Sequence, residues 1–125
     1  MSTILLVEDD SDIAALTTIK LKRAGYTVVW RSDRVSAVEA ASSVAPDLIL
    51  MDVQLVPEEQ GGLLATKTIK ANPHTSGIPI IALSAYAAPP DRELAYAAGC
   101  SDVEEKPINE KRLIEKIKHH LSQRV

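Results

Sequence analysis

Acidic, hydroxyl and amino side chains follow the apolar runs of this chain at the points where those runs end. The run "ILLV" leads into Glu8 and Asp9, "LILM" into Asp52 and "IIAL" into Ser84, and a weaker fifth run is followed by Lys106. Two or three carboxylates with a backbone carbonyl make the hard oxygen site that Mg²⁺ prefers. A lysine and a hydroxyl can bind phosphoryl oxygens, and a carboxylate can act as a nucleophile that becomes an aspartyl phosphate. These residue types therefore suit phosphoryl transfer.

Each of these residues, taken singly, also has an ordinary structural explanation. Acids ahead of a helix cap it and interact favourably with its dipole. An aspartate after a strand commonly begins a turn, and a serine at a strand end is often only solvated. Their joint placement at the ends of separate apolar runs is what favours a functional site.

The alternation of short apolar runs with stretches of helical period predicts the secondary structure. Strands are predicted at 3–7, 27–30, 47–51, 78–84 and 101–103, and helices at 11–24, 34–45, 62–72, 89–98 and 109–121. Continuous apolar strands separated by helices predict an α/β fold class with a doubly wound, five-stranded parallel sheet. Because parallel strands end at one edge, where ligands bind, the polar residues that follow them are predicted to meet there.

Local signals predict how three of the helices begin, end and pack. The helix at 11–24 ends before Gly25, and we expect an apolar stripe of this helix to face the sheet: Ile13, Leu16, Ile19 and Leu21. The last helix has Asn109 as its predicted N-cap and an apolar stripe of its own. Pro89, Pro90 and Gly99 limit the fourth helix, which is expected to be short and mobile.

Composition and charge exclude several classes of protein. The 125 residues suit a single domain, 1–125, and a net charge of -3 offers no basic surface for nucleic acid. No apolar run approaches the ~20 residues that span a bilayer, and the start of the chain does not resemble a signal peptide. Cys100 is the only cysteine, which excludes an internal disulfide and suits a reducing compartment. A cytoplasmic protein without a nucleic-acid or membrane partner is predicted.

Four motifs, "ILLVEDD", "DLILMD", "IPIIALSA" and "EKP", resemble in order and spacing the receiver domain of two-component response regulators. The resemblance covers essentially the whole chain and implies a flavodoxin-like (βα)5 fold with strand order 2-1-3-4-5. It implies that Asp52 is the phosphoacceptor. It also implies a Mg²⁺ site formed by Asp9, Asp52 and the backbone carbonyl of Gln54. Glu8 would be the second acid, which often acts through water.

The same resemblance assigns roles to residues around the phosphoryl group. Ser84 matches the hydroxyl residue that contacts this group, and Lys106 matches the lysine that pairs with it. Pro107 matches a proline whose peptide bond is typically cis in the family. Asp10 matches no core role, so we interpret it as a helix cap.

The function implied by this resemblance is that of a phosphoacceptor in a two-component or phosphorelay system. A histidine kinase or histidine phosphotransfer protein would supply the phosphoryl group to Asp52 in a Mg²⁺-dependent reaction. Signalling would follow from altered partner binding, through the segments 89–98, 101–103 and 109–121, or from onward phosphotransfer. Such a domain promotes its own phosphorylation and dephosphorylation and is not a turnover enzyme. Because the last predicted helix ends almost at the C-terminus, a stand-alone receiver is expected.

Two stretches depart from the family pattern. Receivers usually have a proline four residues after the phosphoacceptor and a glycine eight after it, whereas Pro57 stands at five and Gly62 at ten. This predicts a loop two residues longer, which is either a tolerated surface insertion, the favoured interpretation, or a change in access to the aspartate. Val103 and Glu104 replace an aromatic switch residue and an apolar residue, so the usual readout of phosphorylation is missing. Tyr86 is a candidate for modulating access to the phosphate, and a partly buried loop tyrosine is the simpler interpretation.

Other interpretations and residues complete the sequence-based predictions. A receiver-like docking module that is never phosphorylated is the main alternative. An aspartyl-phosphate phosphatase is disfavoured, because Gln54 occupies the position of its second aspartate. The three histidines are expected to be solvated and Trp30 to serve packing: His74, His119 and His120.

Overall fold

The computed structural model of the chain describes residues 2–55, 60–85 and 88–123, and it contains alternating strands and helices. The elements in chain order are β1 (Thr3–Val7), α1 (Ser11–Arg23), β2 (Thr27–Arg31), α2 (Arg34–Ser43), β3 (Leu48–Asp52), α3 (Gly61–Ala71), β4 (Ile80–Ser84), α4 (Pro89–Ala98), β5 (Asp102–Glu105) and α5 (Glu110–Ser122). Every predicted strand and helix is present, with ends that differ by two residues or fewer.

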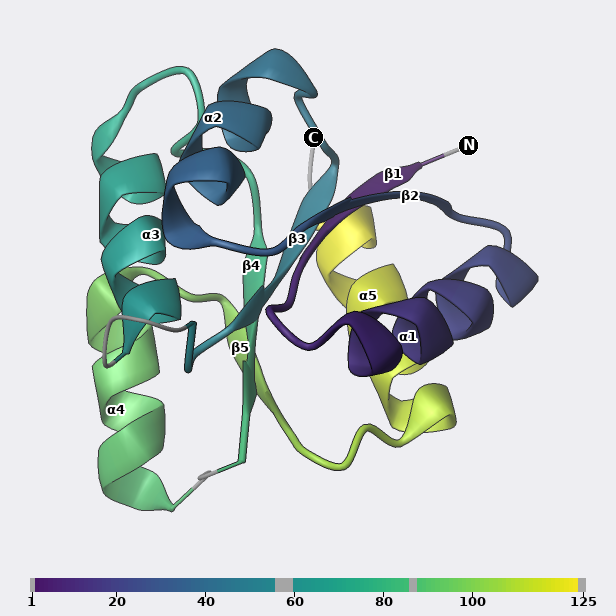
Figure 1. Cartoon of the computed structure of the whole chain (residues 1–125). Helices are drawn as coiled ribbons and strands as arrows, with labels where there is room; N and C mark the ends of the chain where they lie inside the picture. Colours follow the sequence, from purple (N-terminus) through teal and green to yellow (C-terminus); the bar gives the residue numbers. More distant parts are fainter. Residues whose placement is uncertain (1, 56–59, 86–87, 124–125) are drawn as a thin grey trace.

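The five strands form one parallel sheet in the order β2-β1-β3-β4-β5. Helices α1 and α5 cover one face, and α2, α3 and α4 cover the other (Figure 1). Alternate residues of a strand enter opposite core clusters: in β1, Leu5 and Val7 pack on the α2 side, whereas Ile4 and Leu6 pack on the α1 side. Burial on both faces explains the continuous apolar runs. The predicted fold class and strand order are confirmed.

Short polar side chains begin two of the helices, and a glycine ends a third, as the sequence predicts. Asp10 caps α1 by accepting hydrogen bonds from the backbone N–H groups of Asp12 and Ile13. Asn109 caps α5 in the same way. Gly99 follows α4 with φ +114°, a left-handed conformation that favours glycine.

The apolar stripe predicted to bury α1 against the sheet is wrong for three of its four residues. Leu21 is fully buried, but Ile13, Leu16 and Ile19 are 40%, 56% and 58% exposed. The buried positions are instead the small side chains Ala14 and Thr17 together with Leu21. Because α1 turns these smaller side chains toward the sheet, Ile13, Leu16 and Ile19 lie on its exposed side.

No helix in the part of the chain that the structure describes is long and apolar enough to cross a bilayer.

Candidate functional site

Three carboxylates converge at the carboxyl edge of the sheet, as predicted. Glu8 and Asp9 follow β1, and Asp52 is the last residue of the neighbouring strand β3. One carboxylate oxygen from each lies within 4.8 Å of the others. Glu8 and Asp52 are only 1% and 4% exposed, whereas Asp9 is partly exposed. This acidic cluster (Glu8, Asp9 and Asp52) is a set of hard oxygen donors close enough together to share one divalent cation, and it fits Mg²⁺.

Lys106 directly follows the carboxyl end of β5, and its side chain reaches the acidic cluster. Its Nζ lies 3.0 Å from Glu8 Oε1 and 3.3 Å from Asp52 Oδ1. Its backbone N–H donates to the carbonyl oxygen of Ser84, at 2.8 Å, which ties the ends of β4 and β5 together. The peptide bond between Lys106 and Pro107 is cis, as predicted. The lysine therefore places one positive charge beside two buried carboxylates.

Ser84 and Gln54 complete the set of residues that the sequence places at this edge. Ser84 ends β4 and is buried, one strand away from Asp52 in the sheet. The backbone N–H of Gln54 donates to Asp52 Oδ1 at 3.1 Å. The side-chain oxygen of Gln54 accepts a hydrogen bond from the backbone N–H of Gln60. The predicted convergence of these residues is confirmed. Their roles in metal binding and phosphoryl transfer stay predictions.

Burial and neighbouring charges shift the pKa values of Glu8 and Lys106. Burial raises the pKa of Glu8 to about 7, and the hydrogen bond and negative charge of Asp52 raise it as well, although Lys106 opposes them. Burial would lower the pKa of Lys106, but the charges of Asp52 and Glu8 outweigh it and raise this pKa above 10.5. Lys106 contacts two of the three acids, and a divalent cation would add positive charge to the acidic cluster.

Gly62 lies directly against the backbone of Asp52. A Cβ on Gly62 would stand 1.8 Å from the Asp52 carbonyl oxygen, and the Gly62 N–H donates to the Val53 carbonyl oxygen at 2.9 Å. The start of α3 therefore packs onto the end of β3 without room for a side chain. Pro57 and Tyr86 lie outside the described residues, so the predictions about the longer loop and about access to the phosphate remain open.

The two departures in β5 are both buried. Val103 is 1% exposed and packs in the cluster beneath α4. Glu104 is fully buried and forms ion pairs with Arg112 Nη2, at 2.8 Å, and Lys116 Nζ, at 3.0 Å. Burial would raise the pKa of Glu104, but hydrogen bonds from both cations lower it. A charged residue is therefore accommodated here because α5 supplies two cations.

The prediction for His120 is wrong, and Trp30 makes a contact that the sequence did not predict. His120 is not solvated: its side chain is 15% exposed and its Nε2 lies 2.9 Å from Asp102 Oδ2. His74 and His119 are exposed, as predicted. Trp30 is partly buried, at 40% exposed, and its indole N–H also donates to the carbonyl oxygen of Glu8 at 2.7 Å, a polar contact that the packing interpretation did not include. Its position at the end of β2, beside β1, was the available signal for this role.

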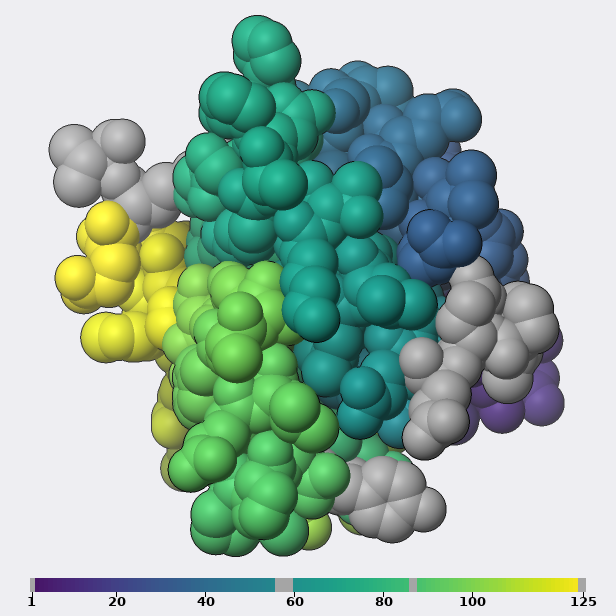
Figure 2. All heavy atoms as spheres, turned by 90° about the vertical axis from the view of Figure 1, so that its left-hand side faces the viewer, coloured from purple at the N-terminus to yellow at the C-terminus, as the bar shows by residue number. Residues whose placement is uncertain are grey.

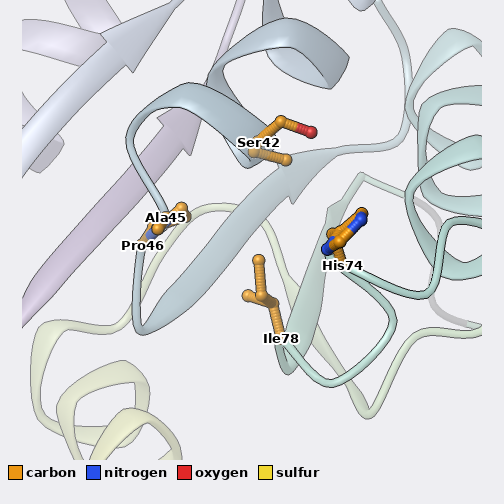
Figure 3. A pocket seen from close by; sticks show the side chains of 6 residues that line it. Ser42, Ala45, Pro46, His74 and Ile78 are labelled. Carbon is orange, nitrogen blue, oxygen red and sulfur yellow. The ribbon is translucent and has the colours of Figure 1, made fainter.

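A hollow of about 290 Å³ lies apart from the acidic cluster. It is bounded by the end of α2 and by the connection between α3 and β4, with Ser42, Pro46, His74 and Ile78 in its wall (Figure 3). Pro46 and Ile78 precede β3 and β4, so this hollow is at the amino edge of the sheet. It takes no part in the site described above.

The chain matches the family model of the response regulator receiver domain over residues 4–118. It is 35% identical to the polar-differentiation response regulator DivK of Brucella anthropi over 119 residues, which cover 95% of each chain. A crystal structure of a putative response regulator from Chloroflexus aurantiacus is 27% identical, with a TM-score of 0.90 over 97% of this chain and 98% of that one. The receiver domain of the sensor histidine kinase PA1611 of Pseudomonas aeruginosa, with magnesium coordinated in its active-site cleft, is 34% identical, with a TM-score of 0.88 over the same shares.

Proposed function

Because this chain belongs to the response regulator receiver domain family, we propose that it accepts a phosphoryl group from a phosphohistidine onto Asp52. The observation that carries the proposal is the buried Asp52 carboxylate, held beside two further acids and Lys106. In the reaction, an Asp52 carboxylate oxygen forms a bond to phosphorus as the phosphorus–nitrogen bond to the imidazole breaks. The leaving imidazole takes up a proton and returns to neutral histidine.

The residues around Asp52 hold it and neutralise charge. Its Oδ1 accepts from the Gln54 N–H and faces Lys106, so the carboxylate has a fixed orientation. Lys106 pairs with a phosphoryl oxygen, and the Ser84 hydroxyl donates to another. Asp52 itself lies on a strand whose five residues are all buried, which limits its motion. Positioning and charge neutralisation are the main demands of phosphoryl transfer.

The metal in this proposal is Mg²⁺, held by Asp9, Asp52 and the Gln54 carbonyl, with Glu8 acting through water. When bound, Mg²⁺ would neutralise the phosphoryl oxygens that approach the acidic cluster. The magnesium coordinated in the PA1611 receiver domain, which is similar to this chain over nearly its whole length, supports this choice. The protein would be a phosphoacceptor that turns over its own phosphoryl group, not an enzyme acting on a separate substrate, and it would act in the cytoplasm.

Phosphorylation of Asp52 is tested by intact-mass measurement after incubation with Mg²⁺ and a small phosphodonor such as phosphoramidate. The wild type is expected to gain one phosphoryl group, and Asp52→Asn to gain none. A wild type that gains no phosphoryl group while it still binds a partner would favour the docking module. Rapid multiple turnover of a phosphate ester would favour a phosphatase.

We place the docking surface for the phosphodonor protein on the exposed residues of α1, namely Ile13, Leu16 and Ile19. Ile13 and Leu16 line a groove of about 460 Å³ whose opposite wall includes Lys106 and Pro107. A protein that binds this apolar surface comes next to the lysine of the site. Exposed apolar residues beside a reactive centre are suited to binding a protein that delivers a reactive group.

Leu16→Asp is therefore expected to lower the rate of phosphotransfer from a protein donor about tenfold or more, because a charge enters an apolar contact. The rate with a small phosphodonor should stay at the wild-type value, since Asp52 is untouched. Both rates are measured with a phosphotransfer protein that phosphorylates the wild type and with phosphoramidate. Leu64→Asp, at a residue 42% exposed on α3, is the matched control. Equal loss in both variants would contradict this surface.

The surface for a downstream partner would comprise α4, β5 and α5. Leu94 and Tyr96 of α4 are each 47% exposed, and they offer apolar contacts to a partner. Figure 2 shows α4 beside α3, with the C-terminal end of α5 next to α4. Phosphorylation would shift the population of conformations that such a partner binds.

A further inference from the structure

Trp30 is a partly exposed aromatic residue on the edge strand β2. It stands near the carboxyl end of β2, in register with Leu6 of β1, and 40% of its surface is exposed. Its indole Nε1 donates a hydrogen bond to the carbonyl oxygen of Glu8, with a donor to acceptor distance of 2.7 Å. Indole N–H groups usually find a partner when the ring is partly buried, and this partner belongs to the acidic cluster.

The bonded carbonyl belongs to the peptide group that joins Glu8 to Asp9. Both acids lie beyond the last residue of β1, where the ladder with β2 comes to its end. The Glu8 N–H still donates to the Arg31 carbonyl oxygen, at 3.1 Å, so β2 holds the amino side of Glu8. The Trp30 indole holds its carboxyl side. These two bonds hold the two peptide groups on either side of the Glu8 Cα, and the second of these peptides joins Glu8 to Asp9.

The turn that begins at Glu8 contains a hydrogen bond of its own before α1 starts. The Asp10 N–H donates to the Glu8 side chain at 3.3 Å, a long bond within the turn itself. Asp10 then caps α1 and so fixes the following segment. The Glu8 to Asp9 peptide lies between the end of β1 and this cap. The indole N–H of Trp30 is therefore a donor from a neighbouring strand that relates the carbonyl side of this peptide to the sheet.

We propose that Trp30 is a positioning residue of the metal site, which acts by orienting the Glu8 to Asp9 peptide through its indole N–H. This inference rests on the proposed function only in that Mg²⁺ binds the acidic cluster. Residues that orient metal ligands without touching the metal commonly change the metal affinity strongly. A single neutral hydrogen bond to the backbone has a more modest effect, so removing it is expected to weaken Mg²⁺ binding about three- to tenfold.

Trp30→Phe tests the inference, because phenylalanine keeps an aromatic ring but has no N–H donor. The Mg²⁺ dissociation constant of the unphosphorylated protein is measured by isothermal titration calorimetry at fixed pH and salt. A rise of about three- to tenfold relative to wild type is expected. A second variant, with benzothienylalanine at position 30, replaces the N–H by sulfur at nearly constant shape and should show the same rise.

Val35→Ala is the matched control, since Val35 is an apolar residue 67% exposed on the neighbouring helix α2. Its Mg²⁺ dissociation constant should equal that of the wild type. A lower thermal midpoint of Trp30→Phe with unchanged Mg²⁺ affinity would show a purely structural role and overturn the inference. If the wild type itself binds no Mg²⁺, the proposed metal site fails, and this inference fails with it. Mg²⁺ binding without phosphorylation of Asp52 would leave the role of Trp30 intact and reject only the proposed function.

Discussion

Gly62→Ala is expected to destabilise the fold by about 3 kcal/mol or more, a larger loss than most single substitutions cause. The added Cβ would stand 1.8 Å from the Asp52 carbonyl oxygen and 2.9 Å from the Val53 Cα. Both are backbone atoms of a buried segment, so no flexible side chain can move aside. The start of α3 would have to shift away from β3, and the Gly62 N–H would lose its bond to Val53.

Gly77→Ala is the matched control for Gly62→Ala. No atom lies within 4 Å of a Cβ built on Gly77, and its φ is not in the left-handed range. Its free energy of unfolding should stay within about 1 kcal/mol of the wild type. Urea denaturation, followed by circular dichroism, measures both variants. Similar stabilities for the two alanine variants would contradict the close approach of α3 to Asp52. Any folded Gly62→Ala protein should also be phosphorylated more slowly, because the start of α3, which packs on the Asp52 backbone, would be displaced.

Lys106→Met is expected to slow phosphorylation of Asp52 by a small phosphodonor about a hundredfold or more. Methionine fills a similar volume but removes the positive charge that lies 3.3 Å from Asp52 Oδ1. The transferred phosphoryl group would then approach the acidic cluster without the positive charge of Lys106 to neutralise its oxygens. Initial rates from intact-mass measurements at saturating Mg²⁺ test this expectation. Lys118→Met, at an exposed residue of α5, is the control and should react at the wild-type rate.

The same variant should also change stability in a way that Mg²⁺ reverses. Without Lys106, the buried acids Glu8 and Asp52 lose the cation that contacts both of them, so the thermal midpoint falls. The folded pKa of Lys106 is raised above 10.5, so its stabilisation is present at neutral pH and is lost only as the pH rises through that folded value. Mg²⁺ should therefore raise the midpoint of Lys106→Met more than that of the wild type at pH 7. An equal Mg²⁺ shift in both proteins would contradict the charge balance described for the site.

The sequence by itself determined the architecture and the convergence of the site. Continuous apolar strands separated by amphipathic stretches allow few arrangements other than a parallel sheet covered on both faces. Once the sheet is parallel, the ends of β1, β3, β4 and β5 must share an edge, so Asp9, Asp52 and Lys106 meet without any knowledge of side-chain packing. Helix caps such as Asp10 and Asn109 were equally predictable, because a cap bonds to backbone groups two or three residues away.

Only the tertiary structure decided which side chains are buried and what they contact. Ile13, Leu16 and Ile19 have the spacing of a buried stripe, yet they are exposed, because α1 turns smaller residues toward the sheet. The burial of Glu104 depends on two cations of α5, and the hydrogen bond of Trp30 joins residues 22 positions apart. Such contacts depend on how separate elements approach one another, and local periodicity carries no information about that approach. The residues of the site therefore follow from sequence and strand order, while the interactions that orient and balance them come from packing across the fold.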